Sequence, residues 1–324
     1  MVAGPEVSII MPIRNEARTI AAALSSALLQ QTVADLEVVI ADGMSDDGTR
    51  EIIEAAAARD VRIRIVDNPD RGTPAGLNAA LAVARGTYWV RLDGHSVVPP
   101  DYLDRLVAHL RAGRCEAVGG VVRALGDSDF GRAVAAAHDS RFGIGNARHH
   151  YATEVGPIDH IAHGAYRMDI SRRIGGFDAE LVRNQDFDFD YRYSQAGGRI
   201  MIDPSVQFER RVRETPRALS RQFYQYGYWK YVVLRRHPES LHLRWLAPPA
   251  LVLALVSSPL LAWSRRGRLL VLLTVASYAA VVGIGSVTIG RRVGLRLTPR
   301  AALGLAVMHL SWGAGFLRSV VAER

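Results

Sequence analysis

The chain has 324 residues, enough for one large α/β domain or for two domains. Its formal net charge is +8, and nearly all of the positive charge is arginine because Lys230 is the only lysine. The single cysteine, Cys115, excludes a disulfide framework and a metal site built from cysteines. This basic balance fits a nucleic-acid binder, a protein of anionic membrane surfaces or an enzyme for phosphorylated substrates.

The first part of the chain alternates short apolar runs with amphipathic, charge-bearing stretches. The apolar runs predict strands at residues 7–13, 37–41, 62–67, 87–92 and 117–122. Helical spacing of apolar residues predicts helices at residues 16–31, 47–59, 73–85 and 100–112. Strands that alternate with helices of this length predict a doubly wound, mostly parallel α/β sheet, which binds ligands beyond the carboxyl ends of its strands.

Polar side chains follow three of the predicted strands. Asn15 and Glu16 come after the first, Asp42 after the second and Asp93 after the fourth. Because the carboxyl ends of parallel strands lie at one edge of a sheet, these groups predict a ligand site there. His95 lies two residues beyond Asp93, so a carboxylate and an imidazole emerge on the same side of the strand end. Together they can hold one divalent ion whose remaining ligands are diphosphate oxygens.

Four motifs then occur in a fixed order within residues 6–236. They are Val-Ser-Ile-Ile-Met-Pro-Ile-Arg-Asn-Glu at 7–16, Val-Ile-Ala-Asp-Gly-Met-Ser-Asp-Asp-Gly-Thr at 39–49, Leu-Asp-Gly-His at 92–95, and Ile-Gly-Gly-Phe-Asp at 174–178 followed by Asn-Gln-Asp at 184–186. In this order they resemble the family 2 inverting glycosyltransferases of the GT-A, Rossmann-like fold. The Asp-x-His variant is most similar to the bacterial succinoglycan and exopolysaccharide type.

The resemblance implies how the donor is bound. Pro12, Arg14 and Glu16 match the loop that wraps the nucleotide, where an acidic group can bond the ribose hydroxyls. Asp42 matches the aspartate that reads the uracil edge of a UDP-sugar, a role for which a carboxylate that accepts from a base N–H is suited.

The resemblance also assigns Asp93 to nucleotide binding and, with His95, to metal binding. Most members of the family have Asp-x-Asp at this motif, and the imidazole here favours Mn²⁺ over Mg²⁺. The metal would stabilise the diphosphate as it leaves. The alternative for His95 is a turn residue that caps the strand.

Asp186 matches the catalytic base, which takes the proton from an acceptor hydroxyl. The family usually has Glu-Asp at this point, whereas this chain has Gln185 before Asp186, so a neighbouring charge that could raise the pKa of the base is missing. Asp188 and Asp190 follow closely, which leaves open which carboxylate acts; on a helix, Asp186 and Asp190 share a face. An acidic helix face that pairs with nearby arginines is the alternative.

The remaining site candidates are expected to contact the acceptor or the diphosphate. They are His163, Gln185, Arg213 and Trp229. For Arg213 a solvated basic face is an equal alternative. Residues 214–245 mix tyrosine and tryptophan with arginine and lysine, which suits helices at the headgroup level of a membrane. The Gln-x-x-Arg-Trp motif of processive synthases is not matched in this stretch.

The composition changes near residue 245. Residues 246–263 and 269–290 carry no charge, and residues 301–317 contain only His309 as a titratable group. Since a helix of about 20 residues crosses a bilayer, these stretches predict two to three transmembrane helices, with buried helices of a soluble bundle as the alternative. Three prolines in the first stretch leave open whether it spans or is re-entrant, and arginines in both following loops leave the orientation open.

These features predict a catalytic domain at residues 1–213, amphipathic interfacial helices at 214–245 and a membrane domain at 246–324. We expect a multi-pass enzyme of the inner (plasma) membrane with its catalytic domain in the cytoplasm. It would use Mn²⁺ or Mg²⁺ to move a hexose from a UDP-sugar to a polyprenyl-diphosphate-linked saccharide, in the synthesis of exopolysaccharide or another cell-envelope glycan.

The alternatives are transfer onto polyprenyl phosphate itself, a processive polysaccharide synthase, and a non-catalytic membrane scaffold that binds nucleotide sugars. A nucleic-acid partner is not expected, because no nucleic-acid-binding module accompanies the basic charge.

Overall fold

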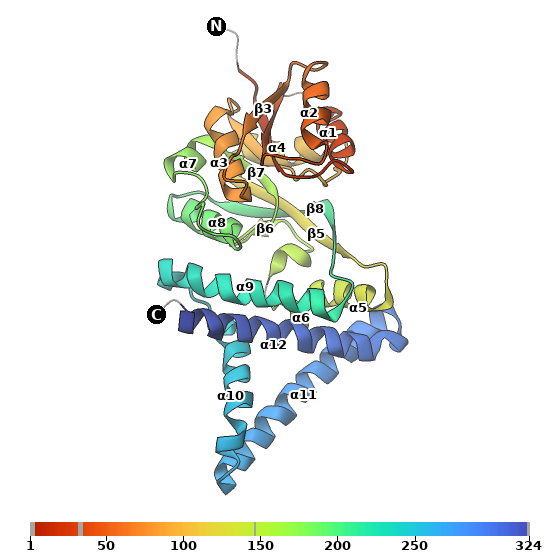
Figure 1. Ribbon diagram of the computed structural model, residues 1–324, viewed down its shortest axis with the longest axis vertical. Coiled ribbons are helices and arrows are strands. Elements are labelled where there is room, and N and C mark those ends of the chain that lie inside the picture. The colour runs from red at the N-terminus through yellow and green to blue at the C-terminus, as the bar shows by residue number, and fades with distance from the viewer. Residues whose placement is uncertain (1–3, 32–34, 146, 323–324) are drawn as a thin grey trace. The chain divides into compact units, whose positions relative to one another are not determined.

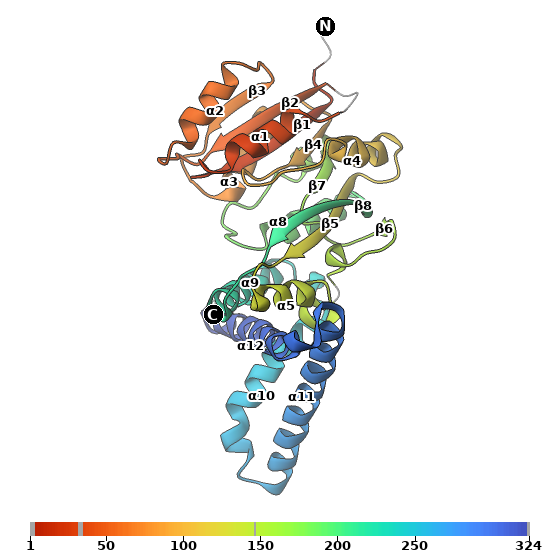
Figure 2. The same ribbon diagram turned by 90° about the vertical axis from the view of Figure 1, so that its right-hand side faces the viewer.

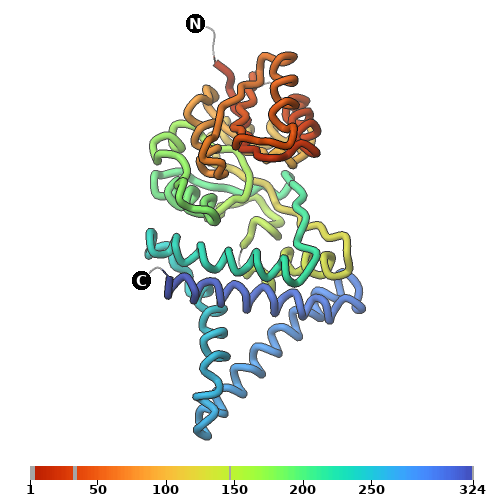
Figure 3. Tube along the Cα trace, in the orientation of Figure 1, coloured from red at the N-terminus to blue at the C-terminus, as the bar shows by residue number. Residues whose placement is uncertain are grey.

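A computed structural model describes residues 4–31, 35–145 and 147–322 and divides into two compact units (Figure 1). The first unit comprises Met1–Val121 and Ala152–Phe208, and the second comprises Val122–Tyr151 and Glu209–Arg324. The chain therefore leaves the first unit, returns to it and leaves it again, a path that the trace in Figure 3 follows. The predicted functional boundaries near residues 213 and 245 stay predictions.

One sheet gathers eight strands of the described residues, in the order β3-β2-β1-β4-β7-β5-β8-β6. The strands are β1 (Val7–Ile13), β2 (Leu36–Asp42), β3 (Ile63–Asp67), β4 (Tyr88–Arg91), β5 (Ala117–Leu125), β6 (Gly156–Pro157), β7 (Gly164–Arg167) and β8 (Ile200–Arg211). The pairs of β1 with β2, β1 with β4, and β2 with β3 are parallel, which confirms the predicted doubly wound α/β half. The short β7 lies antiparallel between β4 and β5, which no local pattern predicted.

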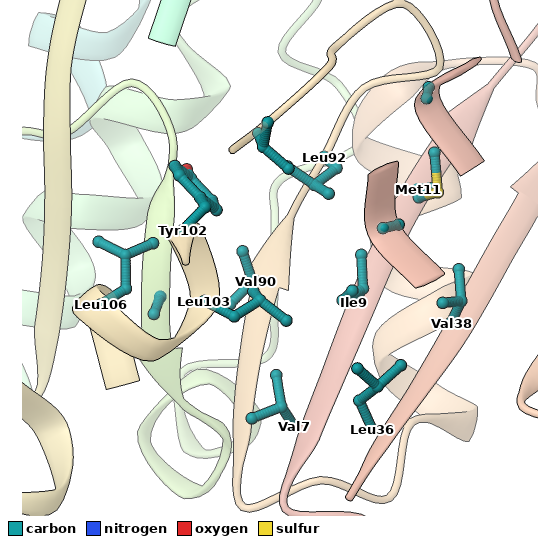
Figure 4. Packing of buried hydrophobic residues seen from close by; sticks show 14 of the residues in the cluster. Val7, Ile9, Met11, Leu36, Val38, Val90, Leu92, Tyr102, Leu103 and Leu106 are labelled. Atoms are coloured by element: carbon teal, nitrogen blue, oxygen red, sulfur yellow. The ribbon is translucent and has the colours of Figure 1, made fainter. Parts of the chain in front are cut away.

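Helices of the first unit cover both faces of this sheet. They are α1 (Ile20–Leu28), α2 (Thr49–Ala57), α3 (Thr73–Val83), α4 (Tyr102–Arg111), α7 (Met168–Arg173) and α8 (Gln185–Gln195). On one face, alternate residues of β1 such as Val7, Ile9 and Met11 are buried with Leu103 and Leu106 of α4 (Figure 4). This period of two is that of a strand with one side turned to each layer of helices.

The opposite face is packed with aromatic rings that fix α8. Trp89 stacks on Tyr166 with ring centroids 4.6 Å apart, and Phe177 stacks on Phe189 of α8 at 4.2 Å. The indole Nε1 of Trp89 donates to Ser171 Oγ at 2.7 Å, so its polar atom is satisfied in the core. Because Phe189 is fully buried, α8 is held close to β4 and β7.

The second unit is helical. Its α-helices are α5 (Asp129–His138), α6 (Arg141–Ile144), α9 (Pro216–Arg236), α10 (Ala247–Leu261), α11 (Arg265–Val293) and α12 (Thr298–Ala322). The helices α9 and α12 lie side by side (Figures 1 and 2). Glycines allow this approach, since a Cβ on Gly227 would meet the Trp312 carbonyl and one on Gly315 would meet the Tyr224 carbonyl. The helices α10 and α11 extend from this pair as a hairpin.

Within the described residues, three helical stretches are long and apolar enough to cross a membrane. They are Leu243–Leu261, Arg265–Val293 and Leu295–Ala322. Of the most apolar window in each, 6%, 11% and 33% is buried by the protein itself. The hairpin of α10 and α11 thus turns most of its apolar surface outward, whereas α12 covers part of its own against α9.

Candidate active site

The loop that follows β1 is held by the segment that follows β2. The backbone N–H groups of Asn15 and Glu16 donate to Ser45 Oγ at 3.0 Å and to Thr49 Oγ1 at 2.8 Å. Asn15 has a φ of 55°, a left-handed conformation that Asn tolerates better than most residues. This bracing ends β1 in an open loop and delays α1 to Ile20, four residues later than predicted.

Asp42 ends β2 and is buried, with only 1% of its surface exposed. Its Oδ1 accepts from Ser45 Oγ at 2.6 Å and from Ser45 N at 3.2 Å. Its Oδ2 has only longer contacts, to Ser45 N and to Arg50 Nη1, both at 3.4 Å. The carboxylate therefore has one tightly bonded oxygen and one that is weakly engaged.

Asp93 lies just beyond β4 between two basic side chains. Arg91 Nε donates to its Oδ1 at 2.8 Å, and His163 Nε2 lies 3.1 Å from its Oδ2. Burial alone would raise the pKa of this carboxyl, but the charges and hydrogen bonds of Arg91 and His163 outweigh it and hold the pKa well below its ordinary value. Asp93 is therefore an anion at neutral pH.

His95 is held by Glu16. Its Nδ1 lies 2.9 Å from Glu16 Oε1, and 60% of its side chain is exposed. A carboxylate bonded to one ring nitrogen fixes the ring and leaves Nε2 as the nitrogen for an ion. Gly94 makes this approach possible, because a Cβ there would lie 2.9 Å from Ile13 Cγ2 and 3.2 Å from Glu16 Cγ.

A cavity of about 270 Å³ opens where β1, β3 and β4 end, close to the lower end of the range of about 300–1,000 Å³ usual for ligand pockets. Several of the predicted donor-site residues line it. They are Pro12, Arg14, Glu16, Asp93, His95 and Gln185. Asp42 does not line it. Of the described residues, four arginines face two carboxylates across this cavity, so its lining is basic. The arginines are Arg14, Arg71, Arg91 and Arg183.

The three carboxylates of α8 lie in different environments. Asp190 is fully buried and accepts from His160 Nδ1 at 2.7 Å, Ile161 N at 2.9 Å and Tyr166 Oη at 2.9 Å. Asp188 is buried too, and its Oδ2 lies 2.7 Å from Arg192 Nη2. Both carboxylates are thus buried and bonded to neighbouring side chains or backbone, so they serve to hold the structure.

Asp186 differs because 34% of its side chain is exposed. It stands in the first turn of α8, where backbone N–H groups favour an anion, and its Oδ1 accepts from Phe187 N at 2.9 Å. It also borders a second, small cavity of about 10 Å³ together with Arg91 and His163. Exposure therefore distinguishes Asp186 from Asp188 and Asp190, which the spacing of the three residues in the sequence could not do.

The other predicted acceptor residues are divided between the units. His163 and Gln185 belong to the first unit, and the Gln185 Oε1 is buried without a hydrogen-bond partner among the described residues. Arg213 and Trp229 belong to the second, Arg213 exposed before α9 and Trp229 half-buried on α9. Their predicted contacts with an acceptor stay predictions.

Sequence reasoning missed the loop that follows β3. Asn68 and Arg71 of this loop and Thr73 at the start of α3 line the larger cavity, and the Asn68 side chain donates to Gly72 O at 3.0 Å. The polar run Asn-Pro-Asp-Arg-Gly at residues 68–72 stands at a strand end like the others, so the same rule could have found it. His160 was missed as a neighbour of Asp186, because 26 residues separate them and no local pattern links them.

Two kinds of donor atom suit a divalent cation in the larger cavity, the Asp93 carboxylate and the His95 imidazole. No group of three or more His, Cys, Asp or Glu side chains in the described residues could hold an ion by itself. The donor set therefore fits an ion whose remaining ligands come from a bound diphosphate.

Comparisons with known proteins show the family of the chain. The family model "Glycosyl transferase family 2" matches residues 8–175. Succinoglycan biosynthesis protein ExoA of Rhizobium meliloti (strain 1021) is 32% identical over 329 residues, covering 98% of this chain and 95% of that protein.

Solved structures also resemble the chain. The mannosyltransferase PcManGT from Pyrobaculum calidifontis, in complex with GDP-Man and Mn²⁺, has a TM-score of 0.64 at 20% identity, over 99% of this chain and 88% of that one. S. aureus TarS 1–349 in complex with UDP has a TM-score of 0.52 at 14% identity, over 98% and 92%. These likenesses show the GT-A-type fold.

Proposed function

Because the chain belongs to glycosyltransferase family 2 and is a glycosyltransferase, we propose that it moves a hexose with inversion from a nucleotide diphosphate sugar to a lipid-linked saccharide. The observation that carries this proposal is the basic cavity at the strand ends, which also holds Asp93 and His95. A diphosphate needs several cationic donors in a site shielded from water, and arginine supplies them in a fixed planar geometry.

The donor would lie across the ends of β1 to β4. Arg14 and Arg71 flank the cavity and would bond the diphosphate, while Pro12 and Glu16 border the nucleotide. Asp42 would read the base through its weakly engaged Oδ2, since Ser45 holds the other oxygen in place. This role suits the N–H of uracil, and UDP-hexose is therefore the proposed donor.

Asp93 and His95 would hold a divalent ion, with Mn²⁺ favoured over Mg²⁺ by the imidazole. The bound ion would offset the charge that develops on the leaving diphosphate. Glu16 would act one shell further out, because it fixes the His95 ring. Arg91 and His163, which contact the two oxygens of Asp93, would share this carboxylate with the ion.

Asp186 would be the general base. It takes the proton of the acceptor hydroxyl as that oxygen forms a bond to the anomeric carbon, and the bond from that carbon to the phosphate oxygen breaks. Such help is worth about 10²–10⁴-fold in rate. His163, Gln185, Arg213 and Trp229 are the proposed contacts to the acceptor or the diphosphate. The Gln185 Oε1, which has no hydrogen-bond partner in the part of the chain that the structure describes, is an acceptor that a sugar hydroxyl could satisfy.

The membrane would present the acceptor. The outward apolar surface of α10 and α11 suits lipid, and α9 mixes aromatic and basic residues as helices at a headgroup layer do. Lys230 of α9 lies 4.3 Å from the ring centroid of Trp245. We place the protein in the inner (plasma) membrane with its catalytic unit in the cytoplasm, where it would extend a polyprenyl-diphosphate-linked saccharide of an exopolysaccharide, as the name of the Rhizobium relative suggests.

Release of UDP or GDP by the purified full chain tests this function. The assay would combine a panel of UDP- and GDP-hexoses with a bacterial lipid extract, with and without Mn²⁺. We expect metal-dependent release from one donor that rises with lipid and falls about 10²-fold or more in Asp186→Asn. Asp169→Asn is the matched control, because Asp169 is 51% exposed on α7 and pairs only with arginines in the described structure. Tight nucleotide binding without turnover of any donor would favour a scaffold instead.

A further inference from the structure

His160 stands between two carboxylates of α8. Its Nδ1 lies 2.7 Å from Asp190 Oδ2, and its Nε2 lies 3.9 Å from Asp186 Oδ2. Asp190 Oδ2 also accepts from Ile161 N at 2.9 Å, so this oxygen is an acceptor, and we assign the hydrogen to Nδ1 and turn Nε2 to Asp186. Asp190 thus holds the ring through Nδ1, and Nε2 faces Asp186, the proposed base.

The anchor is rigid. Asp190 is fully buried and also accepts from Ile161 N and Tyr166 Oη, both at 2.9 Å. Burial raises the pKa of Asp190 above its ordinary value, although the hydrogen bonds and charge of His160 and the other two donors oppose this shift. Because Asp190 Oδ2 lies 2.7 Å from the ring, Asp190 would stabilise a positive charge on His160 together with Asp186.

Asp186, the proposed base, lacks the neighbouring carboxylate that is usual in the family. A second carboxylate beside a base raises the pKa of that base and so favours proton uptake, but residue 185 is a glutamine. A neighbouring group that accepts the proton from Asp186 would favour proton uptake in another way. The two ring nitrogens of His160 face Asp186 and the buried carboxylate of Asp190.

We propose that His160 is a positioning residue that shares the proton taken up by Asp186, an inference that rests on the proposed function. The acceptor hydroxyl proton passes to Asp186 Oδ2 and then to His160 Nε2, while the acceptor oxygen bonds to the anomeric carbon and the nucleoside diphosphate leaves. The imidazolium stands between two carboxylates until the proton is lost to water. The separation of 3.9 Å exceeds a hydrogen bond, so the Asp186 carboxylate must turn or one water must bridge the two groups.

Substitution of His160 in the full chain tests the proposal. His160→Gln keeps a donor for Asp190 but has no nitrogen that can take a proton. The matched control is His109→Gln, because His109 Nε2 lies 2.8 Å from Asp203 Oδ2 in a second buried His–Asp pair that does not border either cavity. The probes are UDP for donor binding, and the active UDP- or GDP-hexose with lipid extract for turnover.

We expect His160→Gln to lower the maximal rate at saturating donor about 10²-fold, with the Kd for UDP within about twofold of the wild type. His109→Gln should keep the maximal rate even where it lowers the melting temperature as much. A maximal rate within about threefold of the wild type in His160→Gln would overturn the proposal and leave His160 a purely structural residue.

A second variant tests the carboxylate that anchors the ring. Asp190→Asn keeps an acceptor for the ring but removes the buried charge, and a fall of about tenfold in maximal rate is expected; no fall would count against the proposal. If the wild type transfers no sugar, the proposed function is wrong, and the inference about His160 is wrong with it. Turnover by the wild type with full activity in His160→Gln refutes this inference alone.

Discussion

The Nδ1 of His95 lies 2.9 Å from the Oε1 of Glu16, although 79 residues separate the two along the chain. The contact joins the loop after β1 to the loop after β4 at the edge of the cavity. It links a residue that matches the nucleotide loop to one that matches the metal motif. If His95 holds a metal as proposed, Glu16 would act on that metal through the His95 ring, a role beyond the one that its motif implied.

Glu16→Gln should weaken metal binding, because an amide holds the ring less firmly and no longer raises its basicity. Loss of such an outer carboxylate typically costs about 10–100-fold in metal affinity. Titration of the protein with Mn²⁺ in the presence of UDP, followed by electron paramagnetic resonance, measures this without turnover. Glu51→Gln on the exposed first turn of α2 is the control. Equal Mn²⁺ affinity in Glu16→Gln and the wild type would refute the role of Glu16.

Arg71→Gln should weaken the binding of UDP but not of uridine. Arg71 lines the cavity from the loop after β3, and a lost hydrogen bond between charged groups costs about 1.5–3 kcal/mol, or at least about tenfold in Kd. Calorimetric titration with both ligands separates the diphosphate from the nucleoside. Arg59→Gln, an exposed arginine just after α2, should leave both affinities unchanged. A parallel loss for uridine would place Arg71 on the base or ribose instead.

Local patterns predicted the β/α alternation and the strand ends, because each strand and its polar cap is encoded by contiguous residues. The pairing of β7 between β4 and β5 was beyond reach, since Gly164–Arg167 is four residues long and its partners lie far away in sequence. The start of α1 was misplaced for a related reason: Asp47 and Thr49, which follow the neighbouring strand β2, hold the loop at residues 16–17.

The candidate site likewise has a part that the sequence predicted and a part that it did not. Asp93, His95 and Glu16 could be brought together in advance because parallel strands end at one edge. Spacing alone could not separate Asp186 from its neighbours, since burial and pairing with His160 and Arg192 decide which carboxylate stays accessible. Such side-chain contacts are set by tertiary packing, so no pattern of neighbouring residues in the sequence predicts them.

Glu37 gives the first unit part of its sensitivity to acid. Its Oε1 accepts from Ser8 Oγ at 2.7 Å and from Arg85 N at 2.6 Å, and its side chain is 2% exposed. Burial would raise its pKa, but the hydrogen bonds from Arg85 and Ser8 prevail and lower it from 4.5. A lowered folded pKa stabilises the protein above pH 4.5, and this stabilisation is lost as the pH falls below that value.

Glu37→Gln should therefore lower the free energy of unfolding at pH 7 by about 2 kcal/mol, the value of a hydrogen bond to a charged group. The difference in free energy of unfolding between the variant and the wild type should disappear as the pH falls toward 3. Thermal unfolding in detergent at a series of pH values measures this. With Glu51→Gln the pH dependence should match the wild type. A gap that stays constant down to pH 3 would mean that the charge of Glu37 contributes nothing.

The last prediction concerns α11, whose residues 269–290 carry no charge. Val281 lies near its middle with 46% of its surface exposed, so an arginine there would meet lipid rather than protein if the helix spans a bilayer. A charge at the centre of a spanning helix costs about 2.5–3.5 kcal/mol. Val281→Arg should thus raise the share of the protein that alkaline carbonate releases from membranes. Val61→Arg, a substitution at a residue of the first unit that is 97% exposed, should leave that share unchanged. Equal release of Val281→Arg and the wild type would contradict the prediction and show that α11 rests outside the hydrocarbon, since a buried arginine would weaken the association with the membrane.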